Sequence, residues 1–198
     1  MRVLRVIVCA TLLSAAPALA QENEAAVEVT VSVTRGLAVD RPFTVVYPST
    51  MQLVEDGDDV TIATLDYRGA PVHCDAMIGD GGTADWTADT AAANLDRPGT
   101  EAGWLEQFPA FAISAVSTVA FQSGPAMFYQ GESQSSPFGV PATIFHAEAV
   151  DGGRTYIFEC IADTTIAAQA KGLVDFLFAN FSTRSDGECC IDPAAPRE

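Results

Sequence analysis

The sequence has very little positive charge. Lysine occurs once, at Lys171, and lysine and arginine together number 10 against 26 aspartates and glutamates, which gives a formal net charge of −16. Phosphate backbones and anionic membrane surfaces repel a chain of this charge. We therefore expect neither a nucleic-acid partner nor binding to anionic lipid headgroups.

Long apolar runs are absent after the first twenty residues. The nearest to one, residues 110–121, is interrupted by serines and a threonine, and it is shorter than the roughly 20 residues that cross a bilayer as a helix. We expect no stable membrane insertion of the mature chain.

The first twenty residues, MRVLRVIVCATLLSAAPALA, have a different character. Arg2 and Arg5 precede an apolar run, and small residues end the segment at Ala20. This order is typical of a secretory signal peptide, so we expect cleavage after Ala20 and a periplasmic or secreted protein. Cleavage would remove Cys9 and both arginines, which changes the net charge from −16 to −18.

Cysteine is also scarce, with 5 residues in the whole sequence. Four remain after cleavage: Cys74, Cys160, Cys189 and Cys190. The sequence has no C-x-x-C or H-x-x-x-H spacing that would indicate a zinc site. An even number in an oxidising compartment predicts that all four form disulfides.

The pairing of these cysteines has three alternatives. A bond between the adjacent Cys189 and Cys190 closes a small strained ring. We therefore favour a bond that joins this C-terminal pair to Cys74 or Cys160, although both of those lie in the inward phase of predicted strands and could also pair with each other.

Alternation of apolar and polar residues predicts that most of the chain is β-strand. The predicted strands cover residues 27–34, 42–48, two segments of 51–67 on either side of a turn at 55–59, 72–78, 113–121, 125–131, 140–150 and 154–162. The Asp-Gly-Gly of residues 151–153 is the clearest hairpin signal. Residues 154–162 are apolar on both faces, as in a central strand.

Two regions have helical character. Residues 83–97 are rich in alanine, and residues 101–108 add one or two further turns. A longer helix is predicted from Ile166 to Phe181 by apolar residues at three- and four-residue spacing, and Asp163 or Thr164 can cap its start.

Together these elements predict an α+β fold. A largely antiparallel twisted sheet carries an inserted helix, and a C-terminal amphipathic helix packs on it. We expect a single domain over residues 27–184, preceded by a flexible lead at 21–26 and followed by a cysteine-containing tail at 185–198.

The order of elements and the segment 151–182 resemble the PsbP-like family. The resemblance rests on the hairpin FHAEAVDGGRTYIFEC, the amphipathic helix after it, and the Asn180-Phe181 pair at the end of that helix. It implies an α/β sandwich and a role as an accessory or binding protein. The family supplies no catalytic or ligand residues that match this chain.

Sequence signals for catalysis are few. The stretch GESQS around Ser133 is similar to a G-x-S-x-G nucleophile elbow, but a second serine stands where the last glycine is needed. His73 lies next to Cys74, and His146 lies on another strand, but a thiol nucleophile needs an unpaired cysteine close to an imidazole. We favour a loop serine and two partly exposed strand histidines, and we assign no catalytic residue.

Two groups of residues are candidates for ligand binding. The acidic turn of residues 55–59 offers carboxylates that calcium accepts, from Glu55, Asp56, Asp58 and Asp59, although it lacks the ligand order of an EF-hand. Aromatic and imidazole side chains could line a cleft between helix and sheet. These are Trp86, Trp104, Tyr129 and His146.

The sequence therefore favours an exported, non-catalytic α+β domain without a cofactor, which binds a protein partner or assists in the cell envelope. A small-ligand or calcium-binding module is the alternative, and a hydrolase or thiol enzyme is the second alternative. The oligomeric state and the specific ligand are not predicted.

Overall fold

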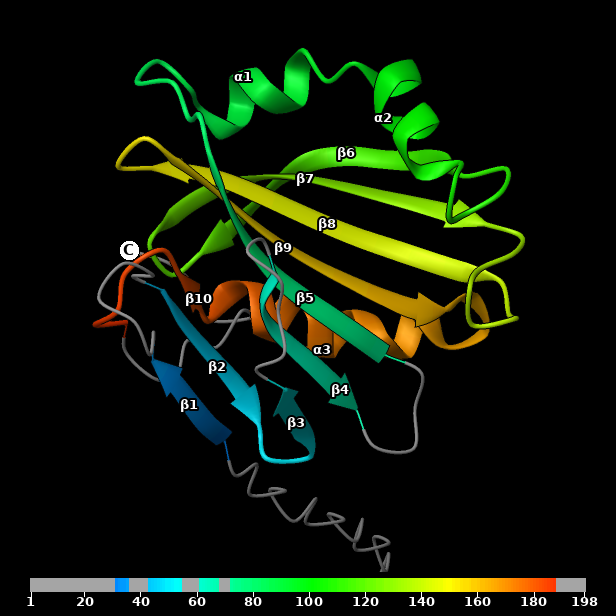
Figure 1. Cartoon of the computed structure of the whole chain (residues 1–198), viewed down its shortest axis with the longest axis horizontal. Coiled ribbons are helices and arrows are strands. Elements are labelled where there is room, and N and C mark those ends of the chain that lie inside the picture. The colour runs from blue at the N-terminus through cyan, green and yellow to red at the C-terminus, as the bar shows by residue number, and fades with distance from the viewer. Residues whose placement is uncertain (1–30, 36–42, 55–60, 68–71, 188–198) are drawn as a thin grey trace, which may run out of the picture.

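The computed structural model describes residues 31–35, 43–54, 61–67 and 72–187, which form two antiparallel sheets and three α-helices (Figure 1). The smaller sheet has the order β1-β2-β10. Its strands are β1 (Val31–Arg35), β2 (Thr44–Pro48) and β10 (Phe181–Ser182). The predicted signal peptide, the acidic turn at 55–59 and the pair Cys189 and Cys190 lie outside the described residues.

The larger sheet has seven strands in the order β3-β4-β5-β9-β8-β7-β6, each antiparallel to its neighbours. Its strands are β3 (Met51–Val54), β4 (Thr61–Tyr67), β5 (Val72–Asp80), β6 (Ala112–Phe121), β7 (Gly124–Ser133), β8 (Ala142–Asp151) and β9 (Arg154–Asp163). The predicted hairpin at residues 151–153 joins β8 to β9, and β9 is the central strand that its two apolar faces predict. The α+β fold class is confirmed.

The segment between β5 and β6 forms two short helices, α1 (Ala88–Ala93) and α2 (Arg97–Trp104). The prediction of one helix over 83–97 is therefore wrong in its bounds. Thr87 caps α1 by accepting a hydrogen bond from the Thr90 amide, and Asp96 caps α2 by accepting one from the Gly99 amide. Because each capping side chain favours the start of a helix, the alanine-rich segment forms two short helices in place of one.

The C-terminal helix α3 (Ala167–Ala179) follows a 3-10 turn (Thr164–Ile166). Asp163, one of the two predicted caps, accepts a hydrogen bond from the Thr165 amide of this turn, and α3 itself has no side-chain cap. Its apolar face packs against one face of the large sheet. The ring of Phe178 lies 5.6 to 6.2 Å from three other phenylalanine rings on β6, β7 and β9. These are Phe121, Phe128 and Phe158.

The opposite face of the large sheet packs against α1 and α2 around a second, smaller apolar cluster. Its buried members come from the segment after α2 and from β6, β7, β8 and β9. They are Phe108, Phe111, Ile113, Met127, Tyr129, Ala142, Ile144 and Ile161. Both helices contact β6 or β7, at one side of the sheet (Figure 1).

The structure joins Cys74 on β5 to Cys160 on β9 by a disulfide, so the preference for a bond from the C-terminal pair to either residue is wrong. The two cysteines are directly opposite each other in the β5–β9 register, with their Cα atoms 4.0 Å apart. Opposed residues of antiparallel strands bring their side chains close together, which allows this bond. Within the described residues, no helix has the length and hydropathy needed to cross a membrane.

Candidate functional site

One half of the sheet face on the α1 and α2 side has no helix on it among the described elements. Figure 1 shows α1 and α2 above β6 and β7, whereas β8, β9 and β5 have no helix in front of them. On these three strands, every second side chain packs into the core beneath α3, and several of the side chains between them point to the opposite face and are partly exposed. We call this group the open face: His73, Asp75, Met77, Glu148, Ile157 and Glu159.

A row of polar side chains crosses the sheet at the open face. The strand registers place Asp75 opposite Glu159, Glu159 opposite His146, and His146 opposite Tyr129. Because directly opposed residues point to the same face, the four side chains line up from β5 to β7. The indole of Trp104 continues the row, since its Nε1 donates a hydrogen bond to the Tyr129 hydroxyl oxygen at 2.8 Å.

His146 is buried within this row, with 7% of its surface exposed. Its Nδ1 lies 3.1 Å from a Glu159 carboxylate oxygen, and its Nε2 lies 3.8 Å from a Glu148 carboxylate oxygen. Its ring stacks on that of Tyr129, with centroids 4.4 Å apart. The imidazole is therefore held between two carboxylates and an aromatic ring.

These neighbours shift the pKa values of both rings. Burial lowers the pKa of His146, but the two carboxylates that favour the imidazolium outweigh it, so the pKa of His146 lies above its ordinary 6.5. Burial raises the pKa of Tyr129, and the nearby carboxylates act in the same direction. Tyr129 therefore stays a neutral phenol throughout the physiological range.

The raised pKa of His146 predicts a pH-dependent stability. The imidazolium contributes stability that is fully present below about pH 6.5, where the unfolded chain is also protonated, and that is lost as the pH rises through the higher folded pKa. We expect the free energy of unfolding, measured by urea denaturation between about pH 6 and 9, to fall more steeply in the wild type than in His146→Gln. Equal pH dependence in the two proteins would exclude this role, and His73→Gln serves as the control for the other histidine.

The second histidine of the open face has its own acidic partner. His73 Nε2 lies 2.9 Å from a carboxylate oxygen of Asp75, two residues along β5. The Phe138 ring, in the loop between β7 and β8, lies 6.2 Å from the His73 ring. Phe138 is 56% exposed, and it is one of the two large apolar side chains that the described residues expose, the other being Leu105 after α2.

The structure brings together three of the four residues of the predicted aromatic cleft. Trp104, Tyr129 and His146 form one connected cluster, through the Trp104–Tyr129 hydrogen bond and the Tyr129–His146 ring stack. Trp86 packs against the apolar cluster that contains Tyr129, and it also lines a cavity at the end of the sheet. Sequence reasoning missed Glu148 and Glu159, which hold the imidazole.

The remaining chemical candidates have structural roles. The Ser133 hydroxyl lies 2.6 Å from two carbonyl oxygens, those of Pro109 and Ser135, and can donate a hydrogen bond to either. It therefore holds neighbouring loop segments in place. Cys74 and Cys160 are oxidised and fully buried. Within the described part of the chain, no three histidine, cysteine or acidic side chains are grouped to hold a metal ion.

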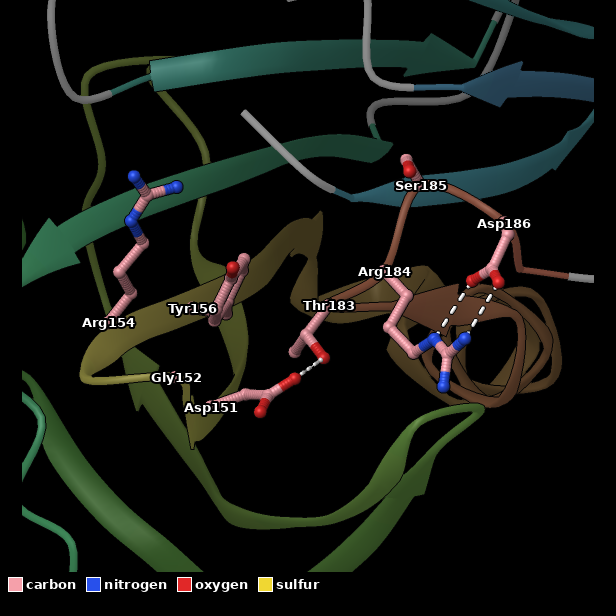
Figure 2. Close-up of a pocket in the computed structure, with 8 residues that line it drawn as sticks. All are labelled: Asp151, Gly152, Arg154, Tyr156, Thr183, Arg184, Ser185 and Asp186. Atoms are coloured by element: carbon pink, nitrogen blue, oxygen red, sulfur yellow. Dashed lines mark hydrogen bonds and ion pairs between the residues drawn. The ribbon is translucent and has the colours of Figure 1, made fainter. Parts of the chain in front are cut away.

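A cavity of about 520 Å³ lies at the end of the sheet, between the β8–β9 hairpin and the segment after β10 (Figure 2). Figure 2 shows Arg184 facing Asp186 and Thr183 facing Asp151 across its wall, at 2.7 and 2.6 Å. The polar groups of this cavity thus already bond to one another. The open face presents partly exposed apolar and acidic side chains on central strands, and we take it as the candidate binding site.

Comparisons with known proteins find similarity in structure alone. No sequence profile of a protein family matches the chain, and no curated protein sequence matches it. The solution structure of cyanobacterial PsbP (CyanoP) from Synechocystis sp. PCC 6803 matches with a TM-score of 0.53 and 10% identity, over 78% of this chain and 92% of that one. The chain has a PsbP-like fold.

A second solved structure shares this PsbP-like fold. It is the Ran-binding protein Mog1p of Saccharomyces cerevisiae, with a TM-score of 0.51 and 10% identity, and the match covers 78% of this chain and 96% of that one. The resemblance expected from residues 151–182 is confirmed. At this identity the comparisons support the fold, and the roles of individual residues rest on the geometry described above.

Proposed function

We propose that the protein is an exported, non-catalytic binding domain of the cell envelope or the extracellular space, and that the open face is where a protein partner binds. The observation that supports this proposal most directly is the partly exposed half of the large sheet, where apolar and acidic side chains lie with no helix of the described residues over them. An antiparallel sheet can leave a polar face in water, whereas exposed apolar side chains surrounded by polar ones are typical of a protein interaction site.

The geometry of the candidate catalytic groups supports a non-catalytic role. A nucleophilic mechanism needs a hydroxyl or thiol within hydrogen-bond reach of a base. The contacts of His146 are two carboxylates and a stacked phenol ring. None of these contacts supplies a nucleophile to the imidazole.

Two features support export. The first twenty residues have the order of a signal peptide, and the disulfide between Cys74 and Cys160 is of a kind that persists in oxidising compartments. Mog1p, which has the same fold, is described as a Ran-binding protein, so at least one protein of this fold binds another protein.

A capture experiment with variants of the open face tests the proposal. Full-length protein with a C-terminal tag is expressed in its native cells, and its co-purifying proteins are quantified by mass spectrometry. We expect Phe138→Ser and Met77→Ser to reduce capture of the main partner by about tenfold, because each removes an apolar anchor from the contact. Glu132→Ser is the matched control, since Glu132 is exposed on the same sheet but in the phase of the opposite face.

Equal capture by all four proteins would show that the open face does not bind the partner. Melting temperatures of the purified variants separate loss of binding from loss of folding. A cytoplasmic location of the full-length protein, found by cell fractionation, would contradict the exported role.

A further inference from the structure

The large sheet ends on one side in a long edge strand. β6 has ten residues and, among the described strands, pairs with β7 alone (Figure 1). The other edge strand of this sheet, β3, has four residues, and the edge strands of the small sheet, β1 and β10, have five and two. Short edge strands are one of the devices that prevent a protein from pairing with other chains. β6 is too long to be protected in this way.

The main-chain groups of β6 point alternately toward β7 and away from it. The strand ends at Phe121 in a two-residue turn to β7, and the first and last residues of such a turn are hydrogen-bonded to each other. Because bonded and non-bonded pairs alternate along antiparallel strands, Val116, Thr118 and Ala120 direct their N–H and C=O groups away from β7. Pro125, opposite Ala120, has no N–H, which agrees with this phase. No other element of the described residues bonds to the main chain of these three.

Protection of this edge is confined to its beginning. The Glu101 carboxylate accepts a hydrogen bond from the Ile113 amide at 2.9 Å, and a β-bulge lies between Ile113 and Ala115. Bulges and charged side chains discourage pairing at sheet edges. The rest of the strand, residues 116–121, has neither, and Thr118 near its middle is exposed. This part of the edge is open to another strand.

The open edge also lies in an uncharged part of the chain. No charged side chain occurs from residue 107 to residue 131, a stretch that includes β6 and nearly all of β7, although the whole chain has a net charge of −16. Like charges oppose the association of two copies of such an acidic chain. Two copies can therefore approach each other most easily through a surface without acidic side chains, and β6 provides one.

We propose that two copies of the chain form a dimer by pairing their β6 strands antiparallel, so that the two large sheets continue as one. A two-fold axis at Thr118 sets this residue opposite the partner's Thr118, and Val116 opposite the partner's Ala120. This register pairs all three outward-directed residues of each strand with one another. An axis at Ser117 would instead set Ala120 opposite the partner's Ser114, which lies in the bulge.

The residues of β6 suit pairing with their own copy. Between positions 114 and 120 the strand has only serine, alanine, valine and threonine, so small and β-branched side chains would meet on both faces of the paired strands. Pairing also satisfies main-chain donors and acceptors that otherwise bond to water. Closed two-fold dimers are the commonest assembly of a single chain. The occupant of the edge is therefore a second copy, and an extended segment of another protein is the alternative that the tests below exclude.

The dimer goes beyond the proposed function and affects how a partner would be bound. A two-fold axis perpendicular to the sheet keeps the α1 and α2 sides of both subunits on the same side of the continuous sheet. The open face, on β5, β8 and β9, does not include β6. The dimer would thus present two open faces in one direction, and a partner that contacts both gains avidity from the linked contacts.

Cysteine substitutions on β6 test the register. In protein whose Cys189 and Cys190 are replaced by serine, Thr118→Cys sets two thiols across the axis, where opposed Cα atoms about 5.5 Å apart allow a disulfide. We expect a covalent dimer after mild oxidation, seen on non-reducing gels. Ser117→Cys is the matched control, since it is also exposed but lies diagonally about 7 to 8 Å from its copy, and we expect it to cross-link at least about tenfold less.

Sedimentation velocity of the purified, disulfide-bonded protein measures the dimer without added cysteines. We expect the wild type to dimerise at about 10 to 100 μM. Thr118→Lys should raise the dissociation constant at least about tenfold, because it sets two ammonium groups opposite each other at the axis. Thr50→Lys makes the same change of charge in the exposed turn between β2 and β3, and we expect it to change the dissociation constant by less than about twofold.

Several results would overturn the dimer. A wild type that stays monomeric at about 100 μM, or equal dissociation constants in Thr118→Lys and Thr50→Lys, would exclude pairing through β6. Cross-linking of Ser117→Cys in place of Thr118→Cys would exclude the register. Melting temperatures of the variants separate loss of the dimer from loss of folding, and the cysteine test still decides if Thr118→Lys does not fold. The capture experiment with Met77→Ser, on β5, tests the proposed function separately, because a monomer can also bind a partner at the open face.

Discussion

Replacement of both Cys74 and Cys160 by alanine is expected to lower the free energy of unfolding by about 2 to 5 kcal/mol. The disulfide joins residues separated by 86 positions and crosses from β5 to the central strand β9. A loop of this length corresponds to about 4 to 5 kcal/mol of lost chain entropy in the unfolded state. This loss is a large fraction of the roughly 5 to 15 kcal/mol that stabilises a typical domain.

Urea denaturation of the wild type and the double variant measures this loss. The control replaces Cys189 and Cys190 with serine, and we expect it to keep the Cys74–Cys160 bond and most of the stability, because both of its changes lie outside that bond. Peptide mapping under non-reducing conditions that joined Cys74 or Cys160 to the C-terminal pair would contradict the observed connectivity.

Phe178→Ala is expected to destabilise the protein by about 3 to 5 kcal/mol. The side chain is 2% exposed and packs edge-on against phenylalanines of β6, β7 and β9. Its removal leaves a cavity at the centre of the contact between α3 and the sheet. Since three strands lose a partner at once, the surrounding structure cannot easily close around the space.

Thermal and urea denaturation test this effect against a control on the same helix. Lys171→Ala removes an exposed side chain that pairs with Asp175 in the next turn, and we expect it to change stability by less than about 0.5 kcal/mol. A similarly small effect of Phe178→Ala would mean that α3 does not pack on the sheet as described.

The hairpin signal predicts part of the site as well as the turn. Asp151-Gly152-Gly153 was identified as a turn, and the register that follows pairs Asp151 with Arg154. Each step back along β8 is matched by a step forward along β9, which brings His146 opposite Glu159. The histidine–carboxylate pair was therefore predictable from alternation and turn position alone.

Other features depend on contacts between segments far apart in the chain. Cys74 meets Cys160 because β5 inserts beside β9, and local periodicity does not contain this pairing. The division between α1 and α2 depends on two capping side chains, Thr87 and Asp96, within an alanine-rich segment that favours one helix. Whether a strand face is covered depends on where these short helices lie on the sheet.

The fold and the candidate site rest on different residues. Phenylalanines of α3 and of the large sheet account for the packing of α3, and many apolar side chains of similar size could replace them. The open face includes acidic and imidazole side chains on central strands. A sheet face that is buried in a core does not require such polar side chains. Polar residues in such positions are the ones most informative about binding.

The most direct test of the open face is carboxyl footprinting in the native envelope. A carbodiimide label is applied to the protein in intact envelope preparations and to the purified protein, and modification of each carboxylate is measured by mass spectrometry. The account predicts that Asp75 and Glu148 are protected in the envelope, whereas Glu132 is labelled equally in both samples. Equal labelling of Asp75 and Glu148 in both samples, or protection confined to Glu132, would contradict it.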